Sequence, residues 1–261
     1  MARIAQQANL SVLTMRAHLI IGALFLLFAA TAFGVPDGGA LPTADAVVAK
    51  MLVRDAQRQA LIAGYRGNRR YVFENNRMQK RAEMLVRVKC DADGTKHFEV
   101  VDAQGWKTAQ KHVLQKMLES EAEASLPQMR MKTRLSPDNY EFHMVRSELL
   151  DGRMAYAIDI VPKRREERLF AGRIWIDAED YALVRSEGKP AKNPSFWTRS
   201  VHFVHRYQKH GPFWFPVSTE SVTEVRLFGS TNVTIDYFDY TPNPLRGPET
   251  AGGAPRGPVT Q

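Results

Sequence analysis

The chain has 261 residues with 44% hydrophobic and 25% charged side chains, a composition that excludes a disordered or collagen-like polymer. Its one cysteine, Cys90, excludes an internal disulfide and any zinc or iron–sulfur site built from several cysteines. The formal net charge of +8 leaves an excess of cationic surface, which suits nucleic acid, an acidic membrane or an acidic protein as a partner.

The first 32 residues have the three parts of a secretory signal peptide. A basic start without acids precedes the unbroken apolar run Leu19–Phe28, and an A-x-A triplet follows at 30–32. We therefore predict cleavage near Ala32 and export to the periplasm, with residues 33–43 as a linker; an uncleaved inner-membrane anchor is the alternative. An exported protein rarely meets chromosomal DNA, so we expect no nucleic-acid partner.

Two amphipathic helices are predicted in the mature chain. Thr43 is a candidate N-cap, and apolar residues recur behind it at three- and four-residue spacing as far as Leu61. Gly64 or Gly67 is expected to end this first helix. The second helix is predicted from about Lys107 to Ala124, with one apolar side.

The remaining sequence has the period of two that is typical of strands, with turns such as Asp151-Gly152 between them. No strand–helix–strand alternation follows residue 125, so the sheet is expected to be antiparallel. About nine or ten strands with two helices cannot bury both faces of a sheet. We predict a mainly β, α+β single domain over residues 44–240, curled into a half-open barrel with the helices on its concave face. Residues 241–261, which contain five prolines and four glycines, are expected to be a disordered tail.

The sequence lacks the common motifs of enzymes and metal sites. It contains no G-x-S-x-G, no H-E-x-x-H and no glycine-rich phosphate loop. His202 and His205 are three residues apart on a predicted strand, so they are expected on opposite faces. Cys90 shares a face with apolar residues and is expected to be a buried, inert thiol. We therefore predict no enzymatic activity, no cofactor and no metal.

Seven side chains predicted on the inward face of the curled sheet are the candidate ligand-binding residues. They are Met84, Val86, Phe98, Phe142, Met144, Tyr156 and Ile158. Methionines and aromatic rings adapt to irregular apolar ligands, so we expect these residues to line a cavity that takes an acyl chain. The alternative is that the two helices fill the hollow completely.

Two basic clusters are candidate contacts for an anionic partner. The first surrounds the first strand and consists of Arg66, Arg69, Arg70, Arg77, Lys80 and Arg81. The second consists of Lys163, Arg164, Arg165 and Arg168, diluted by Glu166 and Glu167. One interpretation is solvated charge that protects a sheet edge from aggregation. The other is docking to an anionic membrane surface or to an acidic envelope protein.

The segment Phe170–Asp177 (FAGRIWID), followed by Tyr181–Arg185, resembles a hairpin common in outer-membrane lipoprotein-sorting proteins of the LolA/LolB superfamily. The later run Phe213–Pro216 is similar to that group as well, and the likeness spans residues 44–242. The carriers' cavity arginine lies in an Arg-Pro motif that has no counterpart here.

The resemblance implies an unclosed, LolA-like barrel whose hydrophobic cavity, lidded by helices, takes acyl chains. It implies a non-enzymatic periplasmic carrier or binding protein for a lipid or an acylated lipoprotein. The alternative is a protein-interaction or sensor module of the envelope that uses the same fold.

Overall fold

The computed structural model describes residues 41–196, 198–227 and 229–245, which form one ten-stranded antiparallel sheet with helices. The strands are β1 (Ile62–Asn75), β2 (Lys80–Cys90), β3 (Lys96–Gly105), β4 (Tyr140–Leu150), β5 (Arg153–Pro162), β6 (Phe170–Asp177), β7 (Leu183–Pro190), β8 (Thr198–His210), β9 (Phe213–Val225) and β10 (Gly229–Pro244). The helices are α1 (Ala44–Gln59), α2 (Lys107–Ala109), the π-helical turn η1 (Gln110–Leu114), α3 (Gln115–Ser125) and α4 (Pro127–Thr133).

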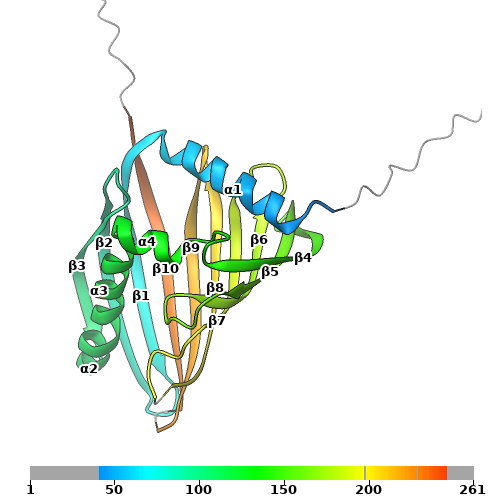
Figure 1. Ribbon diagram of the computed structural model, residues 1–261. Coiled ribbons are helices and arrows are strands. Elements are labelled where there is room, and N and C mark those ends of the chain that lie inside the picture. Colours follow the sequence, from blue (N-terminus) through cyan, green and yellow to red (C-terminus); the bar gives the residue numbers. More distant parts are fainter. Residues whose placement is uncertain (1–40, 197, 228, 246–261) are drawn as a thin grey trace, which may run out of the picture. The chain divides into compact units, whose positions relative to one another are not determined.

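The strand order is β3-β2-β1-β10-β9-β8-β7-β6-β5-β4, so β3 and β4 are the two edges of the sheet. These edges do not pair with each other, and the sheet curves without closing (Figure 1). The predicted half-open antiparallel sheet is therefore confirmed. The expected count of two helices is wrong, because α4 is a further helix.

Local sequence signals explain where the helices begin and end. The Thr43 hydroxyl oxygen accepts a hydrogen bond from the Ala46 backbone N–H at 3.3 Å, which confirms the predicted N-cap. Helix α1 ends at Gln59, earlier than expected, because the chain enters β1 at Ile62. Helices α2 and α3 with η1 form the second predicted helical segment, and α4 begins with Pro127, a residue favoured at the first helical position.

Two separate apolar cores lie on the inner face of the sheet. In the first, which we call the α1 core, α1 packs against β4–β6; its buried members are Ala44, Val47, Val48, Met51, Tyr140, Phe142, Ile158, Ile160, Leu169, Ile174 and Ile176. In the second, the α3 core, the segment 107–125 packs against β1, β2 and β10; its buried members are Tyr71, Phe73, Ala82, Met84, Val86, Val88, Ala109, Leu114, Leu118, Val233 and Ile235. Each large buried side chain contributes about 1.5–3 kcal/mol to stability.

The outer face of the sheet carries the polar half of the strand alternation. Cross-strand ion pairs lie on it, such as Arg87 with Glu99 at 2.7 Å and Arg206 with Glu220 at 2.6 Å. All four of these side chains are exposed, so each pair adds little to stability. The outer face therefore meets water except at a small buried cluster of Ala155, Ala157 and Trp175, and the inner face is the one that the helices cover.

The C-terminal part of the sheet extends further than the sequence predicts. Strand β10 continues to Pro244 and pairs there with the start of β1, with Pro242 opposite Tyr65 and Pro244 opposite Ile62. The prediction of a disordered tail from residue 241 is therefore wrong for residues 241–244. The predicted signal peptide, the predicted linker up to residue 40 and the predicted tail from residue 246 lie outside the described residues. Within residues 41–245, as far as the structure describes them, no helix is long and apolar enough to cross a membrane.

Candidate functional site

One row of side chains across the middle of the inner face, between the two cores, is small and polar. One row of cross-strand partners runs from Ile235 of the α3 core through Thr219, His205 and Ser186 to Ile174 of the α1 core. Strands β7–β9 thus interrupt the apolar surface with three polar residues. No large aliphatic side chain fills this part of the row, so the two cores stay apart.

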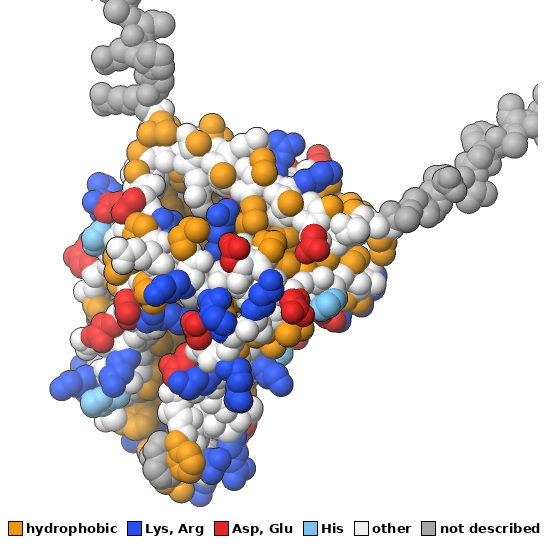
Figure 2. All heavy atoms as spheres, viewed as in Figure 1, with side chains coloured by type: hydrophobic (Ala, Val, Ile, Leu, Met, Phe, Trp, Pro, Cys, Tyr) orange, Lys and Arg blue, Asp and Glu red, His pale blue; other side chains and the backbone are white. Residues whose placement is uncertain are grey.

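A run of three cavities, which we call the inner groove, lies over this middle region and beside it. The first, about 310 Å³, lies over β7 and β8 and contacts the loop 163–169. The second, about 510 Å³, lies between α1 and α4 and shares Leu135 and Leu183 with the first. The third, about 310 Å³, shares Gln59 and Arg130 with the second. Figure 2 shows hydrophobic side chains in the recess beside α1.

Apolar side chains dominate the central part of the inner groove. They include Met51, Leu52, Leu135, Leu183, Phe203 and Tyr207. Helix α4 covers the groove without burying any of its own residues, and Met131 on this helix is 61% exposed. The helix is held through its backbone, because the Asn139 side-chain amide donates to the carbonyls of Met131 and Arg134 at 3.1 and 2.9 Å.

A buried ion cluster fastens α3 to the sheet at the edge of the groove. Arg69, which is 2% exposed, donates to Glu121 of α3 at 2.6 Å and to the Tyr71 hydroxyl at 3.1 Å. Lys96 of β3 donates to the other Glu121 oxygen at 2.7 Å. Burial opposes the charged form of Glu121, but Lys96 and Arg69 outweigh it and lower the pKa of Glu121 to about 2.

The floor of the groove carries a neutral hydrogen-bonded chain. The Thr219 hydroxyl lies 2.6 Å from His205 Nδ1 and 2.9 Å from the Tyr237 hydroxyl. Burial lowers the pKa of His205 to about 4 and raises the pKa of Tyr207 to about 12. Both side chains are therefore uncharged near neutral pH, which makes this floor compatible with an apolar ligand.

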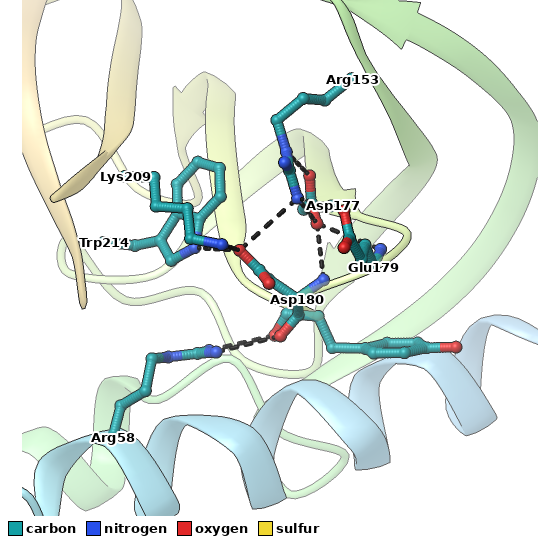
Figure 3. Close-up of polar contacts among 8 residues, drawn as sticks. Arg58, Arg153, Asp177, Glu179, Asp180, Lys209 and Trp214 are labelled. Carbon is teal, nitrogen blue, oxygen red and sulfur yellow. Dashed lines mark hydrogen bonds and ion pairs between the residues drawn. The ribbon is translucent and has the colours of Figure 1, made fainter. Parts of the chain in front are cut away.

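The turn between β6 and β7 is built around one buried carboxylate (Figure 3). The Asp177 side chain is 1% exposed and accepts two hydrogen bonds from Arg153, at 2.6 and 2.9 Å. It also accepts the backbone N–H groups of Glu179 and Asp180 at 3.1 and 2.6 Å. Burial opposes ionisation, but these donors prevail and lower the pKa of Asp177. The turn is thereby held in one conformation.

The same turn holds the C-terminal end of α1 over the groove (Figure 3). Arg58 of α1 donates to the backbone carbonyls of Asp180 and Tyr181 at 3.0 and 3.2 Å. The Asp180 carboxylate in turn accepts from Trp214 Nε1 at 3.0 Å and pairs with Lys209 at 2.7 Å. Residues of β8 and β9 and the end of α1 are thus joined through one turn, which positions the α1 wall of the groove.

The seven predicted ligand-binding residues all lie on the inner face but are divided between the two cores. Val86 and Ile158 are completely buried, and Phe142 is 8% exposed in the α1 core. Met144 and Tyr156 pack at the margin of the α1 core. Met84 and Phe98 line a separate cavity of about 820 Å³ between β3 and α3. None of the seven is among the residues that line the inner groove, and their role in ligand binding stays a prediction.

The sequence interpretation missed the residues that do line the groove. Phe203 and Tyr207 belong to an aromatic-rich stretch whose alternation could have placed them on the inner face. Leu183 stands in the hairpin that carries the family resemblance. Leu135 follows the short helix α4 and has no comparable signal.

The first basic cluster is not a continuous surface. The prediction that Arg69 lies on the surface is wrong. Odd-numbered residues of this part of β1 face inward, so Arg69 is buried against Glu121. Glu83 lies among the outward-facing members and pairs with Arg70 at 2.5 Å and with Arg81 at 3.1 Å. Glu74 also pairs with Arg81. Arg66, Arg77 and Lys80 are exposed, as expected.

The second basic cluster is largely engaged in internal contacts. Arg168 pairs with Glu123 of α3 at 2.6 Å, and Arg164 pairs with Glu166 at 2.8 Å. Lys163 donates to the Pro137 carbonyl at 2.6 Å. These contacts fix the loop 163–169 against the first cavity.

The two histidines of β8 lie on opposite faces of the sheet, and Cys90 is buried, as predicted. His202 pairs with Glu187 on the outer face at 3.3 Å, whereas His205 faces the groove. Cys90 is buried, and burial raises the pKa of its thiol. Among residues 41–245 that the structure describes, no group of three or more side chains could hold a metal ion.

Comparisons with known proteins give one family model and several solved structures of low sequence identity. A model described as a family of unknown function (DUF5686) matches residues 135–241, and no curated protein matches the sequence. Among solved structures, the chain is similar to a DUF1329 family protein from Desulfovibrio piger, with 12% identity, a TM-score of 0.43, and coverage of 82% of this chain and 96% of that one.

Two further solved structures to which the chain is similar are described with LolA or lipoprotein-sorting names. A LolA superfamily protein from Nitrosomonas europaea matches with 12% identity, a TM-score of 0.36, and coverage of 79% and 95%. A domain described as outer-membrane lipoprotein-sorting, from Vibrio parahaemolyticus, matches with 9% identity, a TM-score of 0.39, and coverage of 78% and 93%.

Removing the buried carboxylate of the β6–β7 turn tests its role in holding α1. We expect Asp177→Ala to lower the free energy of unfolding by about 2–3 kcal/mol, because Arg153 and two backbone N–H groups lose their acceptor. Glu179→Ala is the matched control, since Glu179 also binds Arg153 but is 80% exposed; its effect should stay below about 1 kcal/mol. Urea unfolding measures both, and equal midpoints for the two variants would contradict this role.

The low pKa of Glu121 predicts a pH-dependent contribution to stability. A carboxylate whose pKa falls from 4.5 to about 2 on folding stabilises the fold above pH 4.5, and this contribution is lost as the pH falls towards 2. Glu121→Gln should therefore lower the melting temperature near about pH 7 much more than near about pH 3. Glu119→Gln, on the exposed side of α3, is the control and should change little at either pH. An equal loss from Glu121→Gln at both pH values would rule out the ion cluster as the cause.

Proposed function

We propose that this protein is an exported, non-enzymatic binding or carrier protein that holds the acyl chain of a lipid or acylated lipoprotein in the inner groove. The observation that carries the proposal is the run of three cavities between two complete cores. The signal-peptide pattern of residues 1–32 supports export to the periplasm.

The dimensions of the inner groove suit an acyl chain. Ligand cavities in proteins are typically about 300–1,000 Å³ and mostly apolar, and the largest of the three is about 510 Å³. Burial of one methylene contributes about 0.8 kcal/mol, so eight buried methylenes would contribute about 6 kcal/mol. Burial of an acyl chain alone would therefore give useful affinity, without many hydrogen bonds to the ligand.

One cationic side chain of the groove could bind the polar end of a ligand. Arg130 lines both the second and the third cavity, and its guanidinium also donates to the Asp93 carbonyl. A guanidinium forms strong hydrogen bonds with a carboxylate. Its position favours an acyl ligand with one polar end over a pure hydrocarbon.

An envelope protein-interaction or sensor module is the second candidate, and one observation favours it. Strand β3 is an edge strand, and Val100 and Val101 on it are 46% and 48% exposed. The cavity of about 820 Å³ between β3 and α3 lies beside this edge. An extended peptide could add to β3 and place side chains in that cavity.

A bulky side chain in the groove wall tests the carrier proposal. Ala56 of α1 is exposed at the helix surface and lines the second cavity. Ala56→Trp should fill the groove without disturbing a core, and weaken binding of a fluorescent fatty-acid probe by about tenfold or more. Ala49→Trp, at an exposed position of the same helix outside the groove, is the matched control and should bind like the wild type.

Three results would count against the carrier. Absence of saturable probe binding to the wild type would leave the interaction module as the better account. Equal weakening by both tryptophan variants would show that the probe binds elsewhere on α1. Unchanged binding by Ala56→Trp, with an intact fold in circular dichroism, would exclude the cavity between α1 and α4.

A further inference from the structure

Three loops at one end of the sheet each expose a large hydrophobic side chain. They are the β1–β2 turn with Met78, 38% exposed, the β7–β8 loop with Phe196, 74% exposed, and the β9–β10 turn with Leu227, 60% exposed. Phe196 has the highest value among the exposed large hydrophobic side chains of the described residues. The antiparallel strand order places these loops at the end opposite the β4–β5 hairpin (Figure 1).

Contacts between the loops bring these side chains onto one surface, which we call the loop end. The Arg226 guanidinium of the β9–β10 turn lies over the Phe196 ring at 4.7 Å. Arg77 of the β1–β2 turn donates to the Leu227 carbonyl at 3.3 Å. The three loops are therefore neighbours in space although they lie far apart in the sequence.

The loop end is strongly cationic. No Asp or Glu occurs in residues 75–82, 188–200 or 225–235, the segments that contain these loops. Between the loops lies a cavity of about 590 Å³ whose lining includes Arg165, Lys189, Lys192, Arg199 and Arg226. Figure 2 shows Lys and Arg side chains gathered towards this end.

Three acidic residues lie at the edge of this set of cations. Glu167 pairs with Lys192 at 3.4 Å, Glu166 follows Arg165 and pairs with Arg164, and Glu224 is the strand partner of Ser200 and Ser230. Elsewhere on the sheet, as with Arg87 and Glu99, cations and acids are interleaved across the strands. The five cations that line the cavity of the loop end thus converge from three segments of the chain and outnumber the acids beside them.

We propose that the loop end docks on an anionic phospholipid surface. Phe196 and Leu227 would enter the interfacial layer, where amphipathic and aromatic side chains are favoured. The guanidinium groups of Arg165, Arg199 and Arg226 would bind lipid phosphates, for which arginine is well suited. An apolar anchor and a basic patch are the two signals that reversible membrane binding needs. This docking does not depend on the inner groove being occupied.

Vesicle co-sedimentation with paired variants tests the apolar part. The wild type should bind phosphatidylglycerol-containing vesicles and not pure phosphatidylcholine, with binding weakened by salt. The double variant Phe196→Ser, Leu227→Ser should lose about tenfold or more in vesicle affinity. The control is Leu149→Ser with Met154→Ser, two residues 67% and 48% exposed beside the hairpin at the opposite end, and should bind like the wild type.

A charge-matched pair of triple variants tests the cationic part. Lys192→Gln, Arg199→Gln and Arg226→Gln should abolish binding to the anionic vesicles. Arg54→Gln, Lys116→Gln and Lys132→Gln remove the same charge from exposed positions elsewhere and should have little effect. If both triple variants lost the same affinity for anionic vesicles, the attraction would depend only on net charge, and the loop end would not be the docking site.

Two further results would overturn the proposal. Failure of the wild type to bind anionic vesicles at low salt would exclude docking. Tight binding of inorganic pyrophosphate that the loop-end triple abolishes, without vesicle binding, would assign the cavity to a free phosphate and not to a lipid surface. All variants alter exposed side chains, and thermal unfolding checks that each one is folded.

Discussion

The structure depends on one constraint: the inner face of the sheet is wider than the area that α1 and the segment 107–125 can cover. Ten strands form one sheet, but α1 covers one flank and the segment 107–125 covers the other. Each flank buries its own core, and β7–β9 carry Ser186, His205 and Thr219 across the floor between the two cores. Ser186 and Thr219 are only 3% and 5% exposed, and the Thr219 hydroxyl is paired with His205 and Tyr237, so these small polar residues leave space above the floor without the cost of an unpaired Thr219 hydroxyl. The inner groove follows from this division.

Electrostatic contacts hold the two covers in place on either side of the groove. Glu121 joins α3 to β1 and β3 through Arg69 and Lys96, while the turn around Asp177 holds the end of α1 through Arg58. Each of these carboxylates is surrounded by several donors, so removing one leaves buried donors unpaired. The groove can remain open because its walls are fixed by polar contacts at its rim.

Local signals in the sequence predicted most of the fold and little of the candidate site. The Thr43 cap, the Asp151-Gly152 hairpin and the alternation of β2 each depend on neighbouring residues, and each is confirmed. Arg69 was placed wrongly because its face depends on where β1 begins and on its partner in α3. The groove, α4 and the loop end depend on contacts between distant segments, which spacing along the chain does not encode.

Native mass spectrometry of the protein purified from its own envelope tests the central claim most directly. The account predicts a population heavier than the polypeptide by the mass of an acylated molecule, and loss of that mass after delipidation. Ala56→Trp, purified in the same way, should carry much less of it because its side chain occupies the cavity between α1 and α4. The account would be contradicted if the purified wild type had only the mass of its own polypeptide. It would also be contradicted if the wild type carried a second polypeptide without an acyl group.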